Sequence, residues 1–275
     1  MRRTMTNFAA ALLLATTAAG TAVAEKPGGI LRIPFVTSPA SMSIHEESTI
    51  AALGPMMGVF NNLVMFDQHV PQNSLSSIVP DLAESWTYAE DGKSLTFKLR
   101  QGVKWHDGKP FTAKDVKCTW DLIAGNAPEK LRVNPRKSWY RNLESVSVDN
   151  DHQATFSLKR PQPSFIALLA SGWSPIYPCH VPARDMRLKP IGTGPFKFVK
   201  NQEYWKPGRP YLDGIEYTII SNRSTAILAF IAGQFDMTFP YEVTIALLKD
   251  IKAQAPQAVC KEGAANESVG VRSSP

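Results

Sequence analysis

Residues 95–116, "LTFKLRQGVKWHDGKPFTAKDV", combine a strand, two turns and the start of a helix in one short stretch. Apolar and polar residues alternate over 95–99, as expected of a strand with one buried face. Residues 107–110, Asp-Gly-Lys-Pro, are typical of a turn. Thr112 followed by Asp115 is typical of a helix N-terminus closed by a capping box. The stretch therefore predicts a corner at which a β-hairpin leads into a helix.

The sequence on both sides of this corner continues the same patterns. From Ala113 to Ile123 apolar residues recur at steps of three and four, which predicts a helix with one apolar face. Asp91-Gly92 supplies the positive φ that a tight hairpin turn requires, and Asn150-Asp151 marks a second hairpin. The expected antiparallel strands are 83–88, 94–99, 144–148 and 153–158.

The remaining chain shows a different organisation. Residues 30–36 are typical of a buried strand, and the polar loop 37–47 behind it is of a kind that often carries function. After a proline-rich, irregular passage at 175–182, strands and helices alternate, which indicates an α/β arrangement. The further elements expected are a helix over 49–63 interrupted near Gly54-Pro55, helices over 164–170, 225–232 and 243–253, and strands over 196–199, 215–220 and 236–239. Residues 261–275 lack periodicity and are predicted to be disordered.

The first 24 residues indicate export. Arg2 and Arg3 precede an apolar run at 8–15, and Ala22-Val23-Ala24 supplies a small-residue cleavage site before Glu25. The run is much shorter than the roughly 20 apolar residues that span a bilayer. We therefore expect residues 1–24 to be a cleaved signal peptide and the product to be periplasmic.

Charge and cysteine content narrow the possible partners. The sequence carries 30 basic and 24 acidic residues, and because two of the basic residues lie in the signal, the mature net charge is +4. The basic residues form no run or aromatic-interleaved stripe, so we expect no nucleic-acid partner, and we expect a monomer. Cys118, Cys179 and Cys260 allow at most one intramolecular disulfide, and their spacing leaves the pairing open.

Motifs for enzyme chemistry are largely missing from the sequence. There is no GxSxG nucleophile elbow, and residues 45–47, His-Glu-Glu, lack the second histidine that a zinc protease needs one helical turn later. Residues 192–194, Gly-Thr-Gly, lack the third glycine of a dinucleotide-binding motif and are interpreted as a tight entry into a strand. We predict no enzyme activity, cofactor or metal site. The alternative is a periplasmic hydrolase that uses His106 and Asp107 as a general acid–base pair.

Three stretches, in this order, resemble the bacterial extracellular solute-binding proteins of family 5. They are "PDLAESWTYAEDGKSLTFKLRQGVKWHDGKPFTAKDVKCTWDLI" at 80–123, "PIGTGPFKFV" at 190–199 and "EYWKPGRPYLDGIEYTIISNRSTAILAFIAGQFDM" at 203–237. The resemblance runs from about Gly28 to Cys260, and it is specific because three separate motifs occur in the family's order behind a signal peptide.

The resemblance implies both fold and function. The fold would be an α/β, periplasmic binding protein-like lobe of the type II, large two-lobed class, with a β-rich subdomain. Residues 25–48 and 175–260 would form the discontinuous main part of lobe I, and 49–174 the subdomain. The protein would be the periplasmic substrate-binding component of an ABC importer, closing around a ligand by a hinge. The commonest ligands of the family are dipeptides and oligopeptides, delivered to a permease and ATPase complex at the inner membrane.

The resemblance also implies where ligand contacts would lie. They would come from the loop after the first strand, from the aromatic residues before the second hairpin and, with less support, from a third tryptophan. The implied ligand-binding residues are Ser38, Ser41, Met42, His45, Trp139, Tyr140 and Trp173. The competing interpretation of Trp139 and Tyr140 is that both belong to the core.

Two departures from the family pattern are expected to have consequences. Between Val199 and Lys200 the family carries about a dozen more residues, and the shorter link should leave a sheet edge without its partner. The family is also roughly twice as long, so we expect a chain truncated before the second lobe, whose one-walled site binds weakly or not at all. A lobe that docks on the permease without binding ligand is a further alternative.

Overall fold

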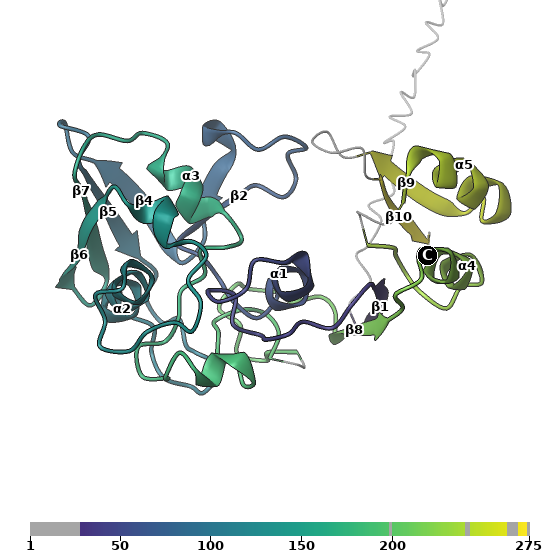
Figure 1. Ribbon diagram of the computed structural model, residues 1–275, viewed down its shortest axis with the longest axis horizontal. Helices are drawn as coiled ribbons and strands as arrows, with labels where there is room; N and C mark the ends of the chain where they lie inside the picture. Colours follow the sequence, from purple (N-terminus) through teal and green to yellow (C-terminus); the bar gives the residue numbers. More distant parts are fainter. Residues whose placement is uncertain (1–27, 198–199, 240–242, 263–268, 274–275) are drawn as a thin grey trace, which may run out of the picture.

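The computed structural model describes residues 28–197, 200–239, 243–262 and 269–273. Figure 1 shows a β-rich body at one end of the molecule and a smaller body of two helices and a hairpin at the other, with a parallel strand pair and a short helix between them. No helix in these ranges is long and apolar enough to cross a membrane. The predicted signal peptide lies outside the described residues.

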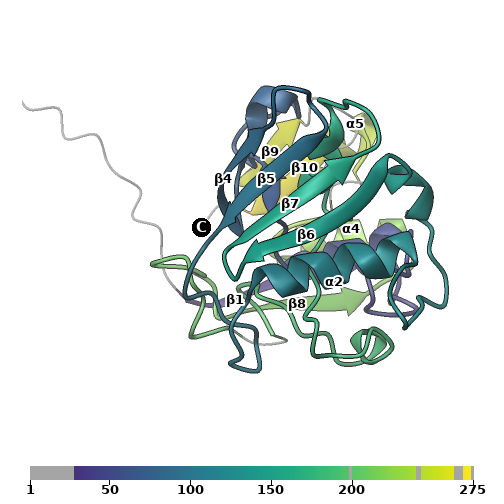
Figure 2. The same ribbon diagram turned by 90° about the vertical axis from the view of Figure 1, so that its left-hand side faces the viewer.

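The β-rich body is built on one antiparallel sheet of four strands. Their order is β4 (Ala83–Tyr88), β5 (Ser94–Leu99), β7 (Gln153–Leu158) and β6 (Leu143–Asn150) (Figure 2). Phe97 of β5 and Phe156 of β7 are fully buried and meet edge to face, with their ring centroids 5.4 Å apart. Both predicted hairpins are confirmed, and only β6 is longer than expected.

Helix α2 (Ala113–Ala124) covers this sheet along β6 (Figure 2). Its apolar face buries Val116, Trp120 and Ile123, and the Trp120 ring lies 5.0 Å from Phe156 between centroids. Burying one large apolar side chain stabilises a fold by about 1.5–3 kcal/mol, so this face accounts for the position of the helix. The helix ends at Gly125, which has a φ of 83°. Helices commonly end at a glycine in this left-handed conformation.

Asp115 ties the corner before α2 to two other parts of the chain. Its buried carboxylate accepts hydrogen bonds from Thr112 N at 2.8 Å, from Cys179 N at 2.8 Å and from Trp105 Nε1 at 3.4 Å. Burial raises the pKa of Asp115, and the three donors oppose that shift. The predicted capping box is confirmed, and its carboxylate has the additional task of fixing Trp105 and the loop that holds Cys179.

The same loop is joined to α2 covalently. Cys118 and Cys179 form a disulfide with their Cα atoms 5.5 Å apart, closing a separation of 61 residues. Cys260 is a free, half-buried thiol. The pairing that the sequence left open is thereby assigned.

The β-rich body is completed by a short hairpin and a helix. Strand β2 (Val64–Phe66) pairs antiparallel with β3 (Ile78–Pro80), behind a 3-10 turn at Leu75–Ser77. Helix α3 (Phe165–Ala170) packs against β2. Phe165 and Leu169 of α3 are fully buried in the same core as the sheet.

The centre of the molecule holds the parallel pair β1 (Ile30–Phe35) and β8 (Gly214–Ile219), which are in register from Ile30 opposite Gly214. Helix α1 (Ile50–Met56) lies beside them and contains Pro55 (Figure 1). The predicted helix over 49–63 is therefore too long. A proline within a helix removes one backbone donor and crowds the turn before it.

A close backbone contact explains why the chain leaves the helix after α1. Gly194 N donates to Val59 O at 2.9 Å and Phe196 N to Gly58 O at 3.0 Å. A Cβ atom on Gly192 would lie 1.9 Å from Val59 O, closer than side-chain atoms can approach. The glycines of residues 192–194 therefore serve a backbone-to-backbone contact, in place of the strand entry predicted for them.

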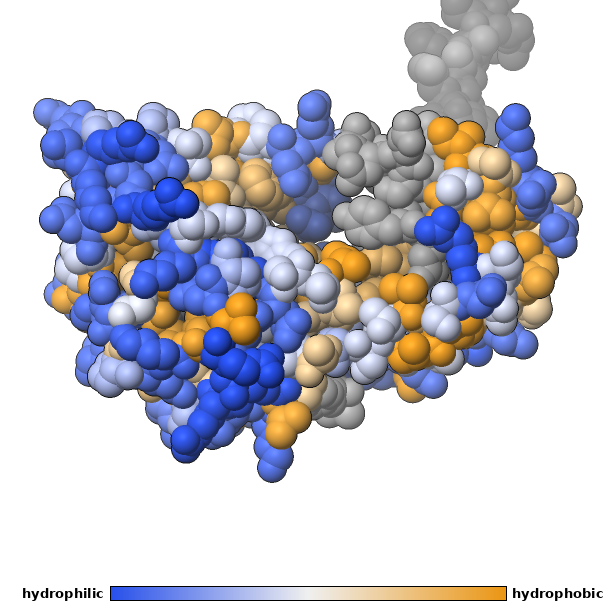
Figure 3. Space-filling view, viewed as in Figure 1, coloured by the Kyte–Doolittle hydropathy of each residue, from blue (hydrophilic) through white to orange (hydrophobic). Residues whose placement is uncertain are grey.

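Helices α4 (Arg223–Ile231) and α5 (Ile245–Gln254) form the smaller body with β9 (Ala258–Glu262) and β10 (Val269–Ser273). Asn222 Oδ1 and Thr244 Oγ1 accept the capping hydrogen bonds at the two helix starts. Apolar side chains gather on the face of this body in Figure 3.

Three predicted elements differ in this half of the chain. Residues 236–239 contain one bridge residue, Met237, where a strand was predicted. Phe196 and Lys200 form a single antiparallel bridge where the strand 196–199 was expected, and residues 198–199 lie outside the described part. The β9–β10 pairing replaces the irregular tail expected over 261–262 and 269–273, while the rest of that tail is also outside the described residues.

We expect the Cys118–Cys179 bond to contribute about 2–4 kcal/mol to the free energy of unfolding, because it restricts a long loop in the unfolded chain. The double variant Cys118→Ser/Cys179→Ser should show this loss in urea unfolding, whereas Cys260→Ser should change it by less than about 0.5 kcal/mol. A thiol reagent should find one free thiol in the denatured, unreduced protein. Three thiols there would contradict the bond.

Replacing Asp115 by asparagine should lower the free energy of unfolding by about 1–3 kcal/mol, since an amide cannot accept all three hydrogen bonds and leaves a buried donor unpaired. The matched control is Asp121→Asn on the same helix, which removes a partly exposed pair with Lys117 and should cost under about 0.5 kcal/mol. Equal losses for the two variants would disprove the central role of Asp115.

Candidate functional site

A groove of about 530 Å³ lies between α1, the β2 strand and the loop that follows α3. We call it the α1 groove. Its apolar wall includes Leu53 of α1 and, after the end of the helix, Met57 and Phe60. Its volume is in the range usual for small-molecule sites. The groove also contains Trp173, one of the predicted ligand contacts.

The polar lining of the α1 groove is rich in side-chain amides. Asn61, Asn62, Gln68 and Asn73 all line it. Three of these amides are held in place. Asn61 Nδ2 donates to Asp81 Oδ2 at 3.0 Å, Asn62 Nδ2 donates to Ser171 O at 2.6 Å, and Gln68 Nε2 donates to Phe66 O at 2.7 Å. Such amides can offer neutral donors and acceptors to a ligand.

Among the described residues, the formally charged ones that line the groove are Asp81 and Lys206. They pair with each other, with Lys206 Nζ 2.8 Å from Asp81 Oδ1. The Asp81 carboxylate, whose side chain is 3% exposed, also accepts from Asn61 Nδ2 and from Asn62 N. In the described wall of the groove, the positive charge of Lys206 and the negative charge of Asp81 therefore compensate each other.

The indole of Trp173 is half-buried and held from the protein side. The guanidinium carbon of Arg136 lies 4.6 Å from the ring centroid, a cation–π distance. Arg136 is itself buried, and its Nη2 donates to Ile44 O. The ring therefore lines the groove in a defined position, and little side-chain freedom remains to be lost when a ligand binds.

Three of the predicted ligand contacts lie in the interior of the described structure. Tyr140 is buried, with its hydroxyl 2.6 Å from Ser174 Oγ. Ser41 is buried and its Oγ accepts from Ser43 N at 3.1 Å. His45 is buried, and its Nε2 lies 2.8 Å from Pro175 O. Their polar atoms satisfy protein groups, so these side chains do not face the groove.

The imidazole of His45 is also uncharged at neutral pH. Burial and then the nearby charge of Arg136 lower its pKa to about 3, against weaker support from the Pro175 carbonyl. Its ring lies 4.3 Å from that of Tyr177 between centroids. Burial also favours the neutral form of Tyr177, and it raises the pKa of that residue to about 12. The polar residues of this loop thus stabilise the interior beside the groove.

The other predicted contacts are not gathered at the groove. Met42 is half-buried against the core that contains Phe60. Ser38 is exposed, and Trp139 is exposed to 41%, and neither lines the groove. The structure therefore brings Trp173 alone, of the predicted set, into this hollow.

Sequence reasoning missed Asn61, Asn62 and Lys206. Lys206 lies inside a stretch that carried the family resemblance, so a signal was available, but it did not distinguish a ligand contact from a structural one. The two asparagines lie within the helix that was predicted over 49–63. Asn61 meets Asp81 across 20 residues of sequence and Lys206 meets Asp81 across 125, and no local pattern predicts such contacts.

His106 and Asp107 do not form the proposed acid–base pair. The His106 ring bonds to the backbone of 192–194, through Nε2 to Gly194 O at 2.9 Å and through Nδ1 to Gly192 N at 3.3 Å. Asp107 Oδ2 instead lies 2.7 Å from His180 Nε2. Both side chains hold loops together. In the described part of the chain no cluster of three or more His, Cys, Asp or Glu could hold a metal ion.

Comparisons with known proteins identify the family of this chain. The family model described as the middle part of the bacterial extracellular solute-binding proteins, family 5, matches residues 77–270. The glutathione-binding protein GsiB of Escherichia coli strain K12 is 32% identical over 185 residues. The di/tripeptide-binding protein 1 of Pseudomonas aeruginosa is 29% identical over 212 residues. The relatives' names describe binding proteins.

Solved structures share the fold. The periplasmic binding protein DppA of Helicobacter pylori, in complex with the peptide STSA, matches with a TM-score of 0.73 and 25% identity over 86% of this chain. The oligopeptide-binding protein AppA of Bacillus subtilis, with a nonapeptide, gives 0.72 and 27% over 86%. These matches confirm the predicted α/β fold of a periplasmic binding protein.

This chain matches only part of each of these proteins. The matched regions are 62% of this chain and 35% of GsiB, and 66% of this chain and 38% of the Pseudomonas protein. For the solved structures the shares of the other chain are 51% for DppA and 48% for AppA. The chain thus spans about half the length of the solved neighbours.

The buried state of His45 predicts how stability depends on pH. The unfolded chain binds a proton at this residue near pH 6.5 and the folded chain only near pH 3, so the unfolded state takes up protons as the pH falls and stability decreases. This residue should lower the free energy of unfolding by roughly 2 kcal/mol between pH 6.5 and pH 5.

Urea unfolding of the protein and of His45→Gln at pH 7 and pH 5 measures this contribution. Between the two pH values, the free energy of unfolding should fall by roughly 2 kcal/mol less in His45→Gln than in the unchanged protein. His69→Gln, at an exposed histidine, should keep the original pH dependence. An unchanged pH dependence in His45→Gln would show that the residue is not buried as described.

Proposed function

The chain belongs to the bacterial extracellular solute-binding proteins of family 5, and from this premise we propose that it captures a solute for an ABC importer with the α1 groove as its contact surface. The observation that carries this proposal is the make-up of the groove: a fixed indole, a wall of apolar side chains and several amides, with its two charges paired. This is a surface for recognition, and the residues around it are held by structural bonds.

The solute that suits this surface best is a short peptide. A peptide presents neutral amide groups and apolar side chains along its length, and these match the amides and the apolar wall. The relatives named for glutathione and for di- and tripeptides support the same class. Because the charges of Asp81 and Lys206 are used on each other, the groove should contact the neutral part of such a ligand and leave its charged ends to other groups.

We also propose that the described part of the chain supplies one wall of the binding site. An open groove buries less of a ligand than the 70–90% typical of enclosing pockets, so binding to this chain alone should be weak. The proposed setting is the periplasm, after removal of residues 1–24, with a permease and ATPase complex as the acceptor of the solute.

Isothermal titration with trialanine and with glutathione tests the proposal. We expect weak but measurable binding of at least one of these peptides, and a loss of about tenfold or more in Trp173→Ala, since a packed aromatic contact is removed. The matched control is Trp139→Ala, at a tryptophan that lies outside the groove, which should leave the affinity unchanged.

The two tryptophan variants also decide between the candidate contacts. A loss in Trp139→Ala without a loss in Trp173→Ala would move the site to the aromatic pair predicted before the second hairpin. Binding of neither peptide, by a protein that unfolds cooperatively in urea, would contradict solute capture by this chain and favour the alternative of a lobe that docks on a permease.

A further inference from the structure

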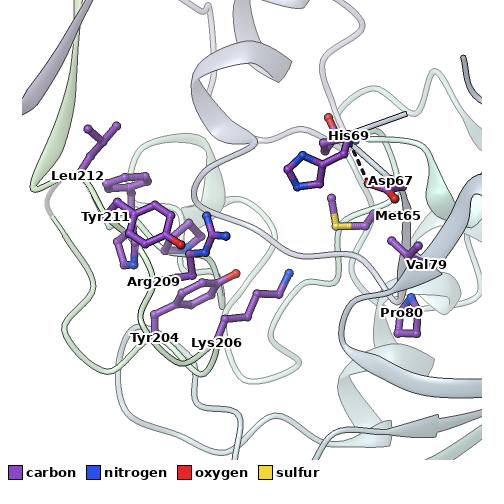
Figure 4. Close-up of a pocket in the computed structure, with 14 residues that line it drawn as sticks. Met65, Asp67, His69, Val79, Pro80, Tyr204, Lys206, Arg209, Tyr211 and Leu212 are labelled. Atoms are coloured by element: carbon purple, nitrogen blue, oxygen red, sulfur yellow. Dashed lines mark hydrogen bonds between the residues drawn. The ribbon is translucent and has the colours of Figure 1, made fainter. Parts of the chain in front are cut away.

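A second hollow, of about 490 Å³, adjoins the α1 groove and shares Met65, Gln68, Tyr204 and Lys206 with it. We call it the Arg209 pocket. One wall comes from the β2–β3 hairpin and the other from the segment 204–212 (Figure 4). The volume again falls in the range usual for small-molecule sites. Nothing in the proposed function uses the groups that distinguish this pocket from the groove.

Most of the pocket is apolar. Its lining includes Met65 and Val79 on the hairpin side and Leu212 on the opposite side. Prolines and an aromatic ring extend this surface: Pro80, Pro195, Pro210 and Phe196. Such walls favour a ligand with an apolar body, because apolar surface leaves water when the ligand enters.

Arg209, an exposed residue, adds a cation to this apolar surface. Its guanidinium carbon lies 4.0 Å from the centroid of the Tyr211 ring. Stacking holds the plane of the guanidinium and leaves the N–H groups at its edge able to bind a planar anion. Among the described residues no carboxylate forms an ion pair with Arg209, so its charge has no acidic partner there.

Of the other charged groups at the pocket, Lys206 is compensated by an ion pair, whereas Asp67 has a backbone hydrogen bond and, among the described residues, no ion pair. Lys206 is paired with Asp81 at 2.8 Å. Asp67 Oδ1 accepts the backbone N–H of His69 at 2.9 Å, across the pocket from Arg209 (Figure 4). With Lys206 neutralised by Asp81, the positive charge left over on the 204–212 side is that of Arg209.

We propose that the Arg209 pocket binds a small organic carboxylate with an apolar body, whose carboxylate pairs with the Arg209 guanidinium while the body lies against the Met65, Val79 and Leu212 wall. Arginine binds carboxylates through two parallel hydrogen bonds, which gives the interaction both strength and direction. The pocket is a second ligand site beside the α1 groove, and this proposal does not depend on peptide capture.

The test uses isothermal titration of the whole chain with 3-phenylpropanoate and with 3-phenylpropanamide, which has the same body and no charge. The carboxylate should bind at least about tenfold more tightly than the amide, in line with a charge-assisted pair. In Arg209→Gln this preference should vanish. Arg223→Gln, at an arginine that lines neither hollow, should keep it.

A further variant separates the two sites. Trp173→Ala, which alters only the α1 groove, should bind 3-phenylpropanoate as before, and Arg209→Gln should bind trialanine as the unchanged protein does. Equal affinity for the acid and the amide, or a preference that survives in Arg209→Gln while urea unfolding is unchanged, would overturn the proposal. A preference lost in Trp173→Ala would do so as well, because it would place the carboxylate in the groove.

Discussion

The fold depends on one buried carboxylate. Asp115 sits at the start of α2, and its two oxygens receive hydrogen bonds from the helix N-terminus, from the corner tryptophan and from the loop at Cys179. A buried acid of this kind is stable only while its donors stay in place. The position of the helix on the sheet and the position of a loop 64 residues further along are therefore set together.

A second constraint brings the later chain onto this frame. The approach of residues 192–194 to the backbone behind α1 is so close that no side chain fits between them, and His106 bonds to the same segment from the corner side. Residues 192–194 precede the segment 204–206 in the sequence. That segment contains Lys206, which pairs with Asp81. Both hollows lie against that segment, so both are positioned by backbone contacts made elsewhere.

The sequence predicted well those features that residues close together in the chain determine. The hairpins around Gly92 and Asn150, and the capping box at Thr112, rest on turn and helix-start preferences that act over a few residues. The candidate groove could not be predicted from the sequence in this way, because Asn61, Asp81 and Lys206 meet only after the chain has folded. His45 and Tyr140 illustrate the same limit: residue type and loop position suit a ligand contact and a satisfied interior group equally, and only the hydrogen bonds to Pro175 and Ser174 decide.

The loop after α3 is fastened to α2 twice, once by the Asp115 hydrogen bond to Cys179 N and once by the disulfide. Trp173 lies six residues before Cys179 in the same loop, so the loop that carries one wall of the candidate groove is held by a covalent link that thiol chemistry can make or remove. In a reducing compartment, where disulfides do not persist, only the weaker fastening remains. The support of the α1 groove therefore depends on the redox state of the surroundings as well as on folding.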